Sequence, residues 1–450
     1  MKKINLILLI AFIILAVILN FIPHLNYQYP LHVDEWVHFQ YSNHLSGNSP
    51  LYFGQDYKSL EAGFHFLLAT LNSMGIPYVF MFTFFASLIT ILICLGVFIL
   101  TRRLFNETAG VFAVLFIALL KSSVMILGPM FFVPMAIGMF FIAISLFLIK
   151  LNSKALVLIL ASILIIHPPT AMAMLLLLLI NIEFLIKRKD YLKNIGLQAL
   201  AGLIALPLYL DTFLSKGFET INQLEFLAIS SSLFIPRFLG WTLVIIALIG
   251  IYFSIEKKKY SIGIYTIAIL FFIFIFYQYK IEVFIPYRRA LMYLFLILAI
   301  PFGLGCEQII SLFKNKKFQI LMGIILIVFI LATVLPAKLE SNKYIYHIID
   351  EGEYNDFIWI KENTDKNSIA VLHPWKANAF TPVAERKVYS RIVQGPNVVS
   401  EAKNKEIDDF FKGKCEDINF LEKNNIGIIY GECNNPNLEE IHHNVWVMKD

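Results

Sequence analysis

Long apolar runs separated by short polar breaks fill the chain from residue 4 to residue 335. A helix needs roughly 20 residues to cross the hydrocarbon of a bilayer, and it satisfies its own backbone hydrogen bonds there. We count about eleven runs that fit this requirement, some of them short. The predicted spans are residues 4–22, 78–100, 109–120, 131–149, 155–166, 171–186, 195–210, 239–255, 262–277, 290–312 and 318–335.

The pattern changes after Pro336, where the apolar runs end. Helix-like segments then alternate with strand-like runs at residues 368–372, 426–430 and 445–448, an order typical of a small α/β domain. The predicted fold class is therefore a membrane all-α bundle followed by a small α/β domain. The domains are a polytopic membrane domain, residues 1–336, and a soluble domain, residues 337–450.

The placement of Lys and Arg predicts the orientation of these spans. Cytoplasmic connections of membrane proteins are rich in Lys and Arg, and alternate connections of this chain are basic. The basic positions are Lys2, Lys3, Arg102, Arg103, Lys150, Lys154, Lys187, Arg188, Lys189, Lys193, Lys257, Lys258, Lys259, Lys314, Lys316 and Lys317. We therefore expect a multi-pass protein of the cell membrane whose N-terminus is cytoplasmic and whose residues 337–450 are extracytoplasmic. The loop of residues 23–61 then lies on the outer side.

Composition supports a lipid environment, because 58% of the residues are hydrophobic and only 15% are charged. The net charge of +5 gives no reason to expect a nucleic-acid partner. Cys94 and Cys306 lie within apolar runs, whereas Cys415 and Cys433 lie in the polar C-terminal part. An oxidising outer compartment would allow that second pair to form a disulfide. Residues 4–22 are read as a retained anchor and not as a cleaved signal peptide.

The loop after the first span carries two adjacent acids between two histidines, in the string LHVDEWVHF of residues 31–39. One interpretation is that Asp34 caps the following helix. The other is functional: a carboxylate that serves as a general base, with Asp34 as the preferred residue and Glu35 as the second. His32, Asp34 and His38 are also a candidate ligand set for zinc, manganese or magnesium. The H-E-x-x-H pattern of zinc proteases is absent.

Two further polar signals interrupt the apolar half. Arg288 and Arg289 form a basic pair on the outer side of the membrane, where few Lys and Arg residues are expected. Arginine binds phosphate through paired hydrogen bonds. Snorkelling of both side chains to lipid headgroups is the alternative. His167 begins the string HPPT between two apolar runs, where a broken helix either lines a cavity or simply turns the chain.

The order of these features resembles the GT-C superfamily of glycosyltransferases that use polyprenyl-phosphate sugars, in the branch of protein O-mannosyltransferases and the aminoarabinose transferase of lipid A. The resemblance rests on the pair Asp34 and Glu35, on the aromatic segment GFHFLLA at residues 63–69, and on TRRLFNETAG at residues 101–110. The resemblance extends loosely across the membrane half and into the outer C-terminal domain.

The resemblance implies a hexosyltransferase-like enzyme in which Asp34 is the base and the anomeric carbon is inverted. It also implies a polyprenyl-phosphate-linked sugar donor, a protein, lipid or glycan acceptor, and membrane lipids as surroundings. The candidate substrate-binding residues are His32, His38, His65, His167, Arg288 and Arg289. The flanking histidines depart from the family pattern and leave the use of a divalent metal open. The paired-tryptophan motif of oligosaccharyltransferases is absent from residues 337–450, which argues against transfer of a whole oligosaccharide to asparagine.

Two other classes of protein fit the pattern of apolar spans. A transporter or flippase for a lipid or polar solute would use the intramembrane charges to line a pathway, and many such proteins show pseudo-symmetric halves. We find no internal repeat in this sequence. A catalytically silent envelope protein would leave the acids of residues 34–35 merely solvated.

Overall fold

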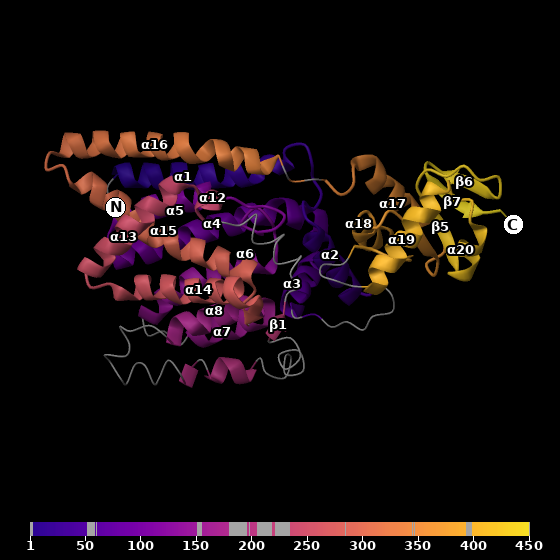
Figure 1. Cartoon of the computed structure of the whole chain (residues 1–450), viewed down its shortest axis with the longest axis horizontal. Coiled ribbons are helices and arrows are strands. Elements are labelled where there is room, and N and C mark those ends of the chain that lie inside the picture. The colour runs from indigo at the N-terminus through magenta and orange to yellow at the C-terminus, as the bar shows by residue number, and fades with distance from the viewer. Residues whose placement is uncertain are drawn as a thin grey trace. The chain divides into compact units, whose positions relative to one another are not determined.

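The structure is a computed structural model of the 450-residue chain, shown in Figure 1. It describes residues 3–51, 59, 61–150, 155–179, 196–197, 199–204, 218–220, 235–283, 285–343, 345, 347–392 and 398–449. The chain divides into two compact units. The helical unit comprises Met1–Tyr29, Leu60–Phe64 and Phe80–Ile345, and the sheet unit comprises Pro30–Ser59, His65–Val79 and Tyr346–Asp450.

The helical unit consists of apolar helices that lie roughly side by side (Figure 1). Its elements are α1 (Lys3–Phe21), η1 (Ile22–His24), α4 (Tyr78–Leu104), α5 (Glu107–Leu119), α6 (Pro134–Lys150), α7 (Ala155–Ile166), α8 (Pro168–Leu179), β1 (Phe218–Thr220), α12 (Ile235–Leu239), α13 (Trp241–Glu256), α14 (Tyr260–Tyr279), β2 (Ile281–Val283), α15 (Tyr287–Ser311) and α16 (Lys316–Asn342). Strands β1 and β2 pair antiparallel. Helix α3 (Ala62–Ser73) contributes residues to both units.

Helix α15 is the buried centre of this unit, and it packs against α5, α13 and α14. Glycines allow the closest of these approaches. A Cβ atom on Gly250 of α13 would lie 1.7 Å from the carbonyl oxygen of Pro301, and one on Gly303 would lie 2.1 Å from that of Ala109. Small residues at such crossings let helix backbones come together, as they do in membrane bundles.

Among the described residues, five helices are long and apolar enough to cross a membrane, namely α1 with η1, α4, α14, α15 and α16. Shorter apolar helices stand at residues 107–119, 134–148, 155–166, 168–177 and 241–256, where further spans are expected. The predicted spans at 171–186 and 195–210 lie partly outside the described residues. The count of about eleven membrane crossings stays a prediction.

The sheet unit contains a five-stranded mixed sheet in the order β4-β3-β5-β7-β6. Strands β3, β4 and β5 are parallel, and β7 pairs antiparallel with both β5 and β6. The elements are α2 (Val33–Leu45), α17 (Glu351–Asn363), β3 (Ile369–Leu372), α18 (Ala377–Ala384), β4 (Lys387–Val388), α19 (Val398–Lys412), α20 (Ile418–Lys423), β5 (Ile426–Tyr430), β6 (Leu438–His442) and β7 (Val445–Met448). The three predicted strands are confirmed.

Helices cover both faces of this sheet, because neighbouring residues of a strand point to opposite faces. Val371 and Ile429 belong to a buried cluster that includes Ile407 and Phe410 of α19. The next residue of β5, Tyr430, packs instead against Phe357 of α17 at a ring distance of 5.1 Å. The predicted small α/β domain is therefore present.

The structure places the boundary between the units later than the sequence predicts. Helix α16 continues through Pro336 to Asn342, and the C-terminal part of the sheet unit begins at Tyr346. A proline removes its own N–H from the helix but does not always end it. The sheet unit also includes residues 30–59, which the sequence assigned to the membrane domain.

Helix α2 packs on α18 within the sheet unit, and two side chains fix its position. The Nδ2 atom of Asn43 donates to the carbonyl oxygen of Pro382 at 3.2 Å, and the Oγ atom of Ser49 donates to that of Thr381 at 3.2 Å. Helix α2, whose first turn carries the two adjacent acids, thus packs against the C-terminal part of the chain.

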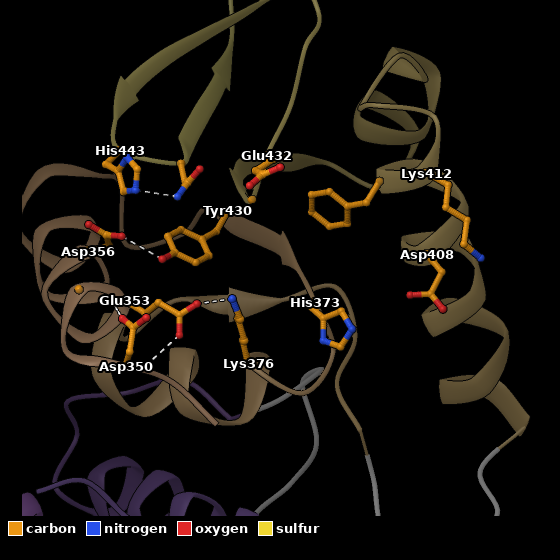
Figure 2. A pocket seen from close by; sticks show the side chains of 14 residues that line it. Asp350, Glu353, Asp356, His373, Lys376, Asp408, Lys412, Tyr430, Glu432 and His443 are labelled. Carbon is orange, nitrogen blue, oxygen red and sulfur yellow. Dashed lines mark hydrogen bonds and ion pairs between the residues drawn. The ribbon is translucent and has the colours of Figure 1, made fainter. Parts of the chain in front are cut away.

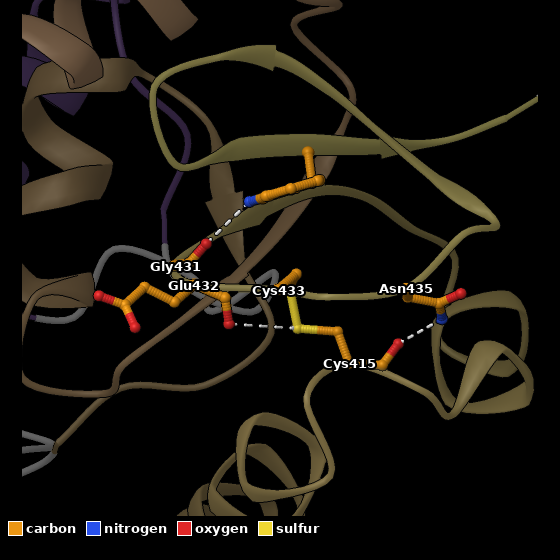
Figure 3. The surroundings of a disulfide bond; sticks show 6 residues. Cys415, Gly431, Glu432, Cys433 and Asn435 are labelled. Carbon is orange, nitrogen blue, oxygen red and sulfur yellow. Dashed lines mark hydrogen bonds between the residues drawn. A yellow bond between two sulfur atoms is a disulfide. The ribbon is translucent and has the colours of Figure 1, made fainter.

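A disulfide joins Cys415 to Cys433, as the sequence led us to expect, and Figure 3 shows its surroundings. Cys415 follows α19 and Cys433 follows β5, so the bond links the segments that leave these two elements. Cys94 and Cys306 are free thiols buried among apolar side chains.

Candidate functional site

The first group of candidate residues surrounds the N-terminus of α2. His32 is the N-cap residue, and its Nδ1 atom accepts a hydrogen bond from the backbone N–H of Asp34 at 3.0 Å. The carboxylate of Glu35 accepts from the backbone N–H groups of Leu31 at 2.7 Å and of His32 at 3.1 Å. This is a capping box in which histidine takes the place usually held by serine or threonine. The alternative interpretation, in which Asp34 caps the helix, is wrong, because His32 is the N-cap residue.

The two adjacent acids differ in their surroundings. Glu35 is fully buried, and its carboxylate is used by the backbone at the helix start. The Asp34 side chain is 18% exposed, and its Oδ2 atom lies 3.8 Å from Nδ1 of His32. Successive residues of a helix point about 100° apart, so the two carboxylates point in different directions. Asp34 is therefore the more exposed of the two acids.

A histidine pair lies one turn further along α2. The Nδ1 atom of His38 is 2.9 Å from the Nε2 atom of His65, which α3 contributes. The ring of Tyr41 stacks on His65 with a centroid distance of 5.0 Å. Burial lowers the pKa of His65 to about 3, so this ring is neutral at ordinary pH.

The second group of polar residues lies in the helical unit, at the start of α8. The Nε2 atom of His167 lies 3.4 Å from a carboxylate oxygen of Glu61, and its Nδ1 atom lies 2.6 Å from Oγ1 of Thr170. The Thr170 hydroxyl in turn lies 2.7 Å from the Tyr293 hydroxyl. His167 is buried, which agrees with a broken helix that lines a polar interior and does not face lipid.

Arg288 and Arg289 stand in the first turn of α15. Arg289 interacts electrostatically with both His167 and Tyr293, and its Nη1 atom contacts the sulfur of Met135 at 3.8 Å. The carboxylate of Glu282 accepts the backbone N–H of Tyr287 at 2.8 Å and so fixes the start of the helix. Two guanidinium groups at the positive end of a helix dipole suit a phosphate ligand.

The structure thus forms two candidate groups and places each in one unit. Asp34, Glu35, His32, His38 and His65 belong to the sheet unit. His167, Arg288 and Arg289 belong to the helical unit together with Glu61.

His32, Asp34 and His38 do not form a ligand set in the described part of the chain, where no three His, Cys, Asp or Glu side chains are close enough to hold a metal ion. The Nδ1 atom of His32 is occupied by the N–H of Asp34, and His38 is paired with His65. The cap and the histidine pair thus each use one ring nitrogen of a proposed ligand.

Sequence reasoning missed Glu61, Thr170 and Tyr293. Thr170 stands in the HPPT string, three residues after His167, and this spacing within one helical turn was available as a signal. Glu61 is a lone acid before α3, and Tyr293 is one of many aromatic residues in an apolar run, so neither stands out in the sequence.

Comparison with solved structures identifies the fold. The apo oligosaccharyltransferase of Archaeoglobus fulgidus superimposes with a TM-score of 0.60 at 13% identity, over 95% of this chain and 69% of that one. The chain has a GT-C-like fold. The same enzyme tethered to an acceptor peptide containing the NVT sequon gives a TM-score of 0.59 at 12% identity, with the same two coverages of 95% and 69%.

A third structure of the archaeal enzyme, in complex with an inhibitory peptide and a dolichol-phosphate, gives a TM-score of 0.51 at 13% identity, again over 95% and 69% of the two chains. A scan against protein-family models and a search of curated proteins find no match. The likeness therefore rests on the GT-C-like fold and not on sequence.

Proposed function

We propose that this protein is a membrane glycosyltransferase that moves a sugar from a polyprenyl-phosphate carrier to an acceptor hydroxyl on the outer face of the membrane. The observation that carries this proposal is that two adjacent acids on a GT-C-like fold have different surroundings. The Glu35 carboxylate holds the helix start, whereas the Asp34 side chain is partly exposed. The archaeal neighbour has been solved with a dolichol-phosphate and with an acceptor peptide, which supports a carrier-linked donor.

In this proposal Asp34 acts as the general base. The oxygen of the acceptor hydroxyl attacks the anomeric carbon, and its proton passes to the Asp34 carboxylate. The bond between the anomeric carbon and the phosphate oxygen breaks, and the phosphate leaves with the electron pair. Attack opposite to the leaving group inverts the anomeric centre.

Arg288 and Arg289 are the proposed contacts of the carrier phosphate. Charge grows on the phosphate oxygen as the bond to the sugar breaks, and preorganised guanidinium groups stabilise that charge. His167 and Glu61 serve as positioning residues, because Glu61 contacts His167 and Arg289 interacts with the same ring.

The experiment is transfer of radiolabelled sugar by the purified full-length protein from a panel of polyprenyl-phosphate donors. Lipid, protein and glycan fractions are counted separately, and a nucleotide-sugar donor serves as control. Transfer from the polyprenyl donors alone supports the proposal. Absence of transfer from every donor, together with solute uptake into vesicles that contain the protein, would instead identify a transporter.

A further inference from the structure

A cavity of about 710 Å³ opens at the carboxyl ends of β3 and β5 in the sheet unit, and Figure 2 shows its lining. His373 directly follows β3, and Glu432 follows β5 after a single glycine. Open α/β sheets bind ligands in the crevice at this end of their parallel strands. The volume also falls in the range of roughly 300–1,000 Å³ that ligand pockets usually have.

The polar side chains along one wall of the cavity pair with other groups of the protein. Asp350 and Glu353 form the capping box of α17, and Lys376 pairs with Glu353. The carboxylate of Asp356 accepts the Tyr430 hydroxyl at 2.9 Å, and it lies 3.1 Å from Nε2 of His442. These side chains form the wall of the cavity, and their polar groups already have partners within the protein.

The opposite side carries polar groups that face solvent. Asp408 and Lys412 project from α19, and Figure 2 shows them together with His373 and Glu432 around the opening. Within the described residues, none of these four side chains has a hydrogen bond or ion pair. The cavity therefore offers two carboxylate acceptors, one ammonium donor and one imidazole to a ligand.

The half-buried ring of Phe411 adds an apolar surface among these groups. Gly431 allows the ring to lie where it does, since a Cβ atom at that position would come within 2.8 Å of it. The φ angle of Gly431 is +155°, which also favours glycine. The disulfide between Cys415 and Cys433 joins the chain beyond α19 to the chain beyond β5, and so holds the two sides of the opening together.

The charge of the lining selects among ligand classes. Five carboxylates and two lysines line the cavity, so it is acidic and repels phosphates and acidic glycans. A basic peptide side chain would satisfy the carboxylates but would offer no acceptor to Lys412. Each hydroxyl of a sugar both donates and accepts, and the C–H face of a sugar ring can pack on an aromatic ring.

We propose that this cavity is a binding site for a neutral saccharide, in which Asp408 and Glu432 accept hydrogen bonds from sugar hydroxyls and Phe411 packs against the sugar ring. The site lies wholly within the sheet unit, and binding there requires no transfer step. It fits a glycan that is already present on the acceptor or on the product.

The test measures binding to the full-length protein in detergent by saturation-transfer NMR and calorimetry. The probes are mannobiose, maltose, cellobiose and N,N′-diacetylchitobiose, with mannose 6-phosphate and a lysine-rich hexapeptide for comparison. The variants are Asp408→Asn, Glu432→Gln and Phe411→Leu. Asp409→Asn is the matched control, because Asp409 is exposed on the same helix and does not line this cavity. Thermal unfolding shows whether each variant is folded.

We expect saturable binding of at least one neutral disaccharide, about tenfold weaker in Asp408→Asn and in Glu432→Gln, as loss of one charge-assisted hydrogen bond predicts. Binding should also weaken in Phe411→Leu, which removes the aromatic surface for the sugar ring, and stay unchanged in the control. Binding of no neutral saccharide overturns the proposal. So does saccharide binding that the three variants leave unchanged, or binding of only the basic peptide. Because the readout is binding, its failure is distinguishable from a failure of sugar transfer.

Discussion

The Nδ1 atom of His38 lies 2.9 Å from the Nε2 atom of His65, and this contact joins α2 to α3. One ring must donate and the other must accept, so the contact requires that His65 stay neutral or that the two rings share one proton. Burial holds the pKa of His65 at about 3. The pair therefore holds α2, the helix that carries Asp34, against α3. Protonation of both rings at acidic pH would break this contact.

Stability should fall as the solution becomes acidic. The ordinary pKa of the ring is 6.5 and the folded value is about 3, so between these values the unfolded chain takes up a proton that the folded chain does not. The free energy of unfolding therefore decreases as pH falls through this window. His65→Gln should lower the melting temperature at pH 7.5 yet lose less stability than wild type between pH 7.5 and pH 5.

The control for that experiment is His443→Gln, which changes an exposed histidine of the sheet unit. Its pH dependence should match the wild type. If His65→Gln and wild type lose equal stability on acidification, the histidine pair does not couple folding to pH.

Glu35 should prove structural. Glu35→Ala leaves the backbone N–H groups of Leu31 and His32 without their buried acceptor, which we expect to cost about 1–3 kcal/mol of unfolding free energy. Transfer activity per folded molecule should be retained to a large extent. Thermal unfolding and activity measured on the same preparation separate the two effects. A variant of wild-type stability with abolished transfer would place Glu35 in the chemistry.

The disulfide gives a test of location as well as of stability. Its two cysteines are 18 residues apart, and closing a loop of this size stabilises a fold by about 3 kcal/mol in the chain-entropy model. Cys415→Ser should therefore lower the unfolding temperature of the protein. Alkylation of unreduced cells should find Cys415 and Cys433 blocked, as expected for an extracytoplasmic domain. Two freely alkylated thiols would place residues 346–450 in a reducing compartment.

Arg289 should act on the binding of the donor. Arg289→Ala removes a charged donor of hydrogen bonds to phosphate, worth about 1.5–3 kcal/mol, and we expect roughly a tenfold to hundredfold loss in kcat/KM for the polyprenyl donor. Arg103→Ala is the control, because Arg103 is an exposed arginine at the end of α4. Equal kinetics for Arg289→Ala and wild type would leave the phosphate to other residues.

The elements of the fold were predictable where a local pattern specifies them. The strands at 369–372 and 426–430 have apolar runs between polar breaks, and the long spans have the length that hydrocarbon requires. Packing of α2 on α18 was not predictable. It depends on hydrogen bonds from Asn43 and Ser49 to carbonyl groups more than 300 residues away, and no local pattern records such a contact.

The candidate site was likewise predictable only where a local sequence pattern marks its residues. The acids at positions 34 and 35 stand out because charge is rare beside apolar spans, whereas their roles depend on which carboxylate the helix start uses. Glu at the third helical position signals a capping box, but histidine is an unusual N-cap, so the sequence suggested Asp34 instead. Glu61 became visible only when the fold brought it to His167.

The central claim is tested most directly by comparing the transfer of labelled sugar from polyprenyl-phosphate donors by wild type and by Asp34→Asn. Asparagine preserves the shape of the side chain but cannot accept the proton, and loss of a general base slows transfer by about 10²- to 10⁴-fold. The account predicts that loss in a variant that still folds, because the His32 cap receives the backbone N–H of residue 34 and not its side chain. Equal rates for wild type and a folded Asp34→Asn variant would contradict it.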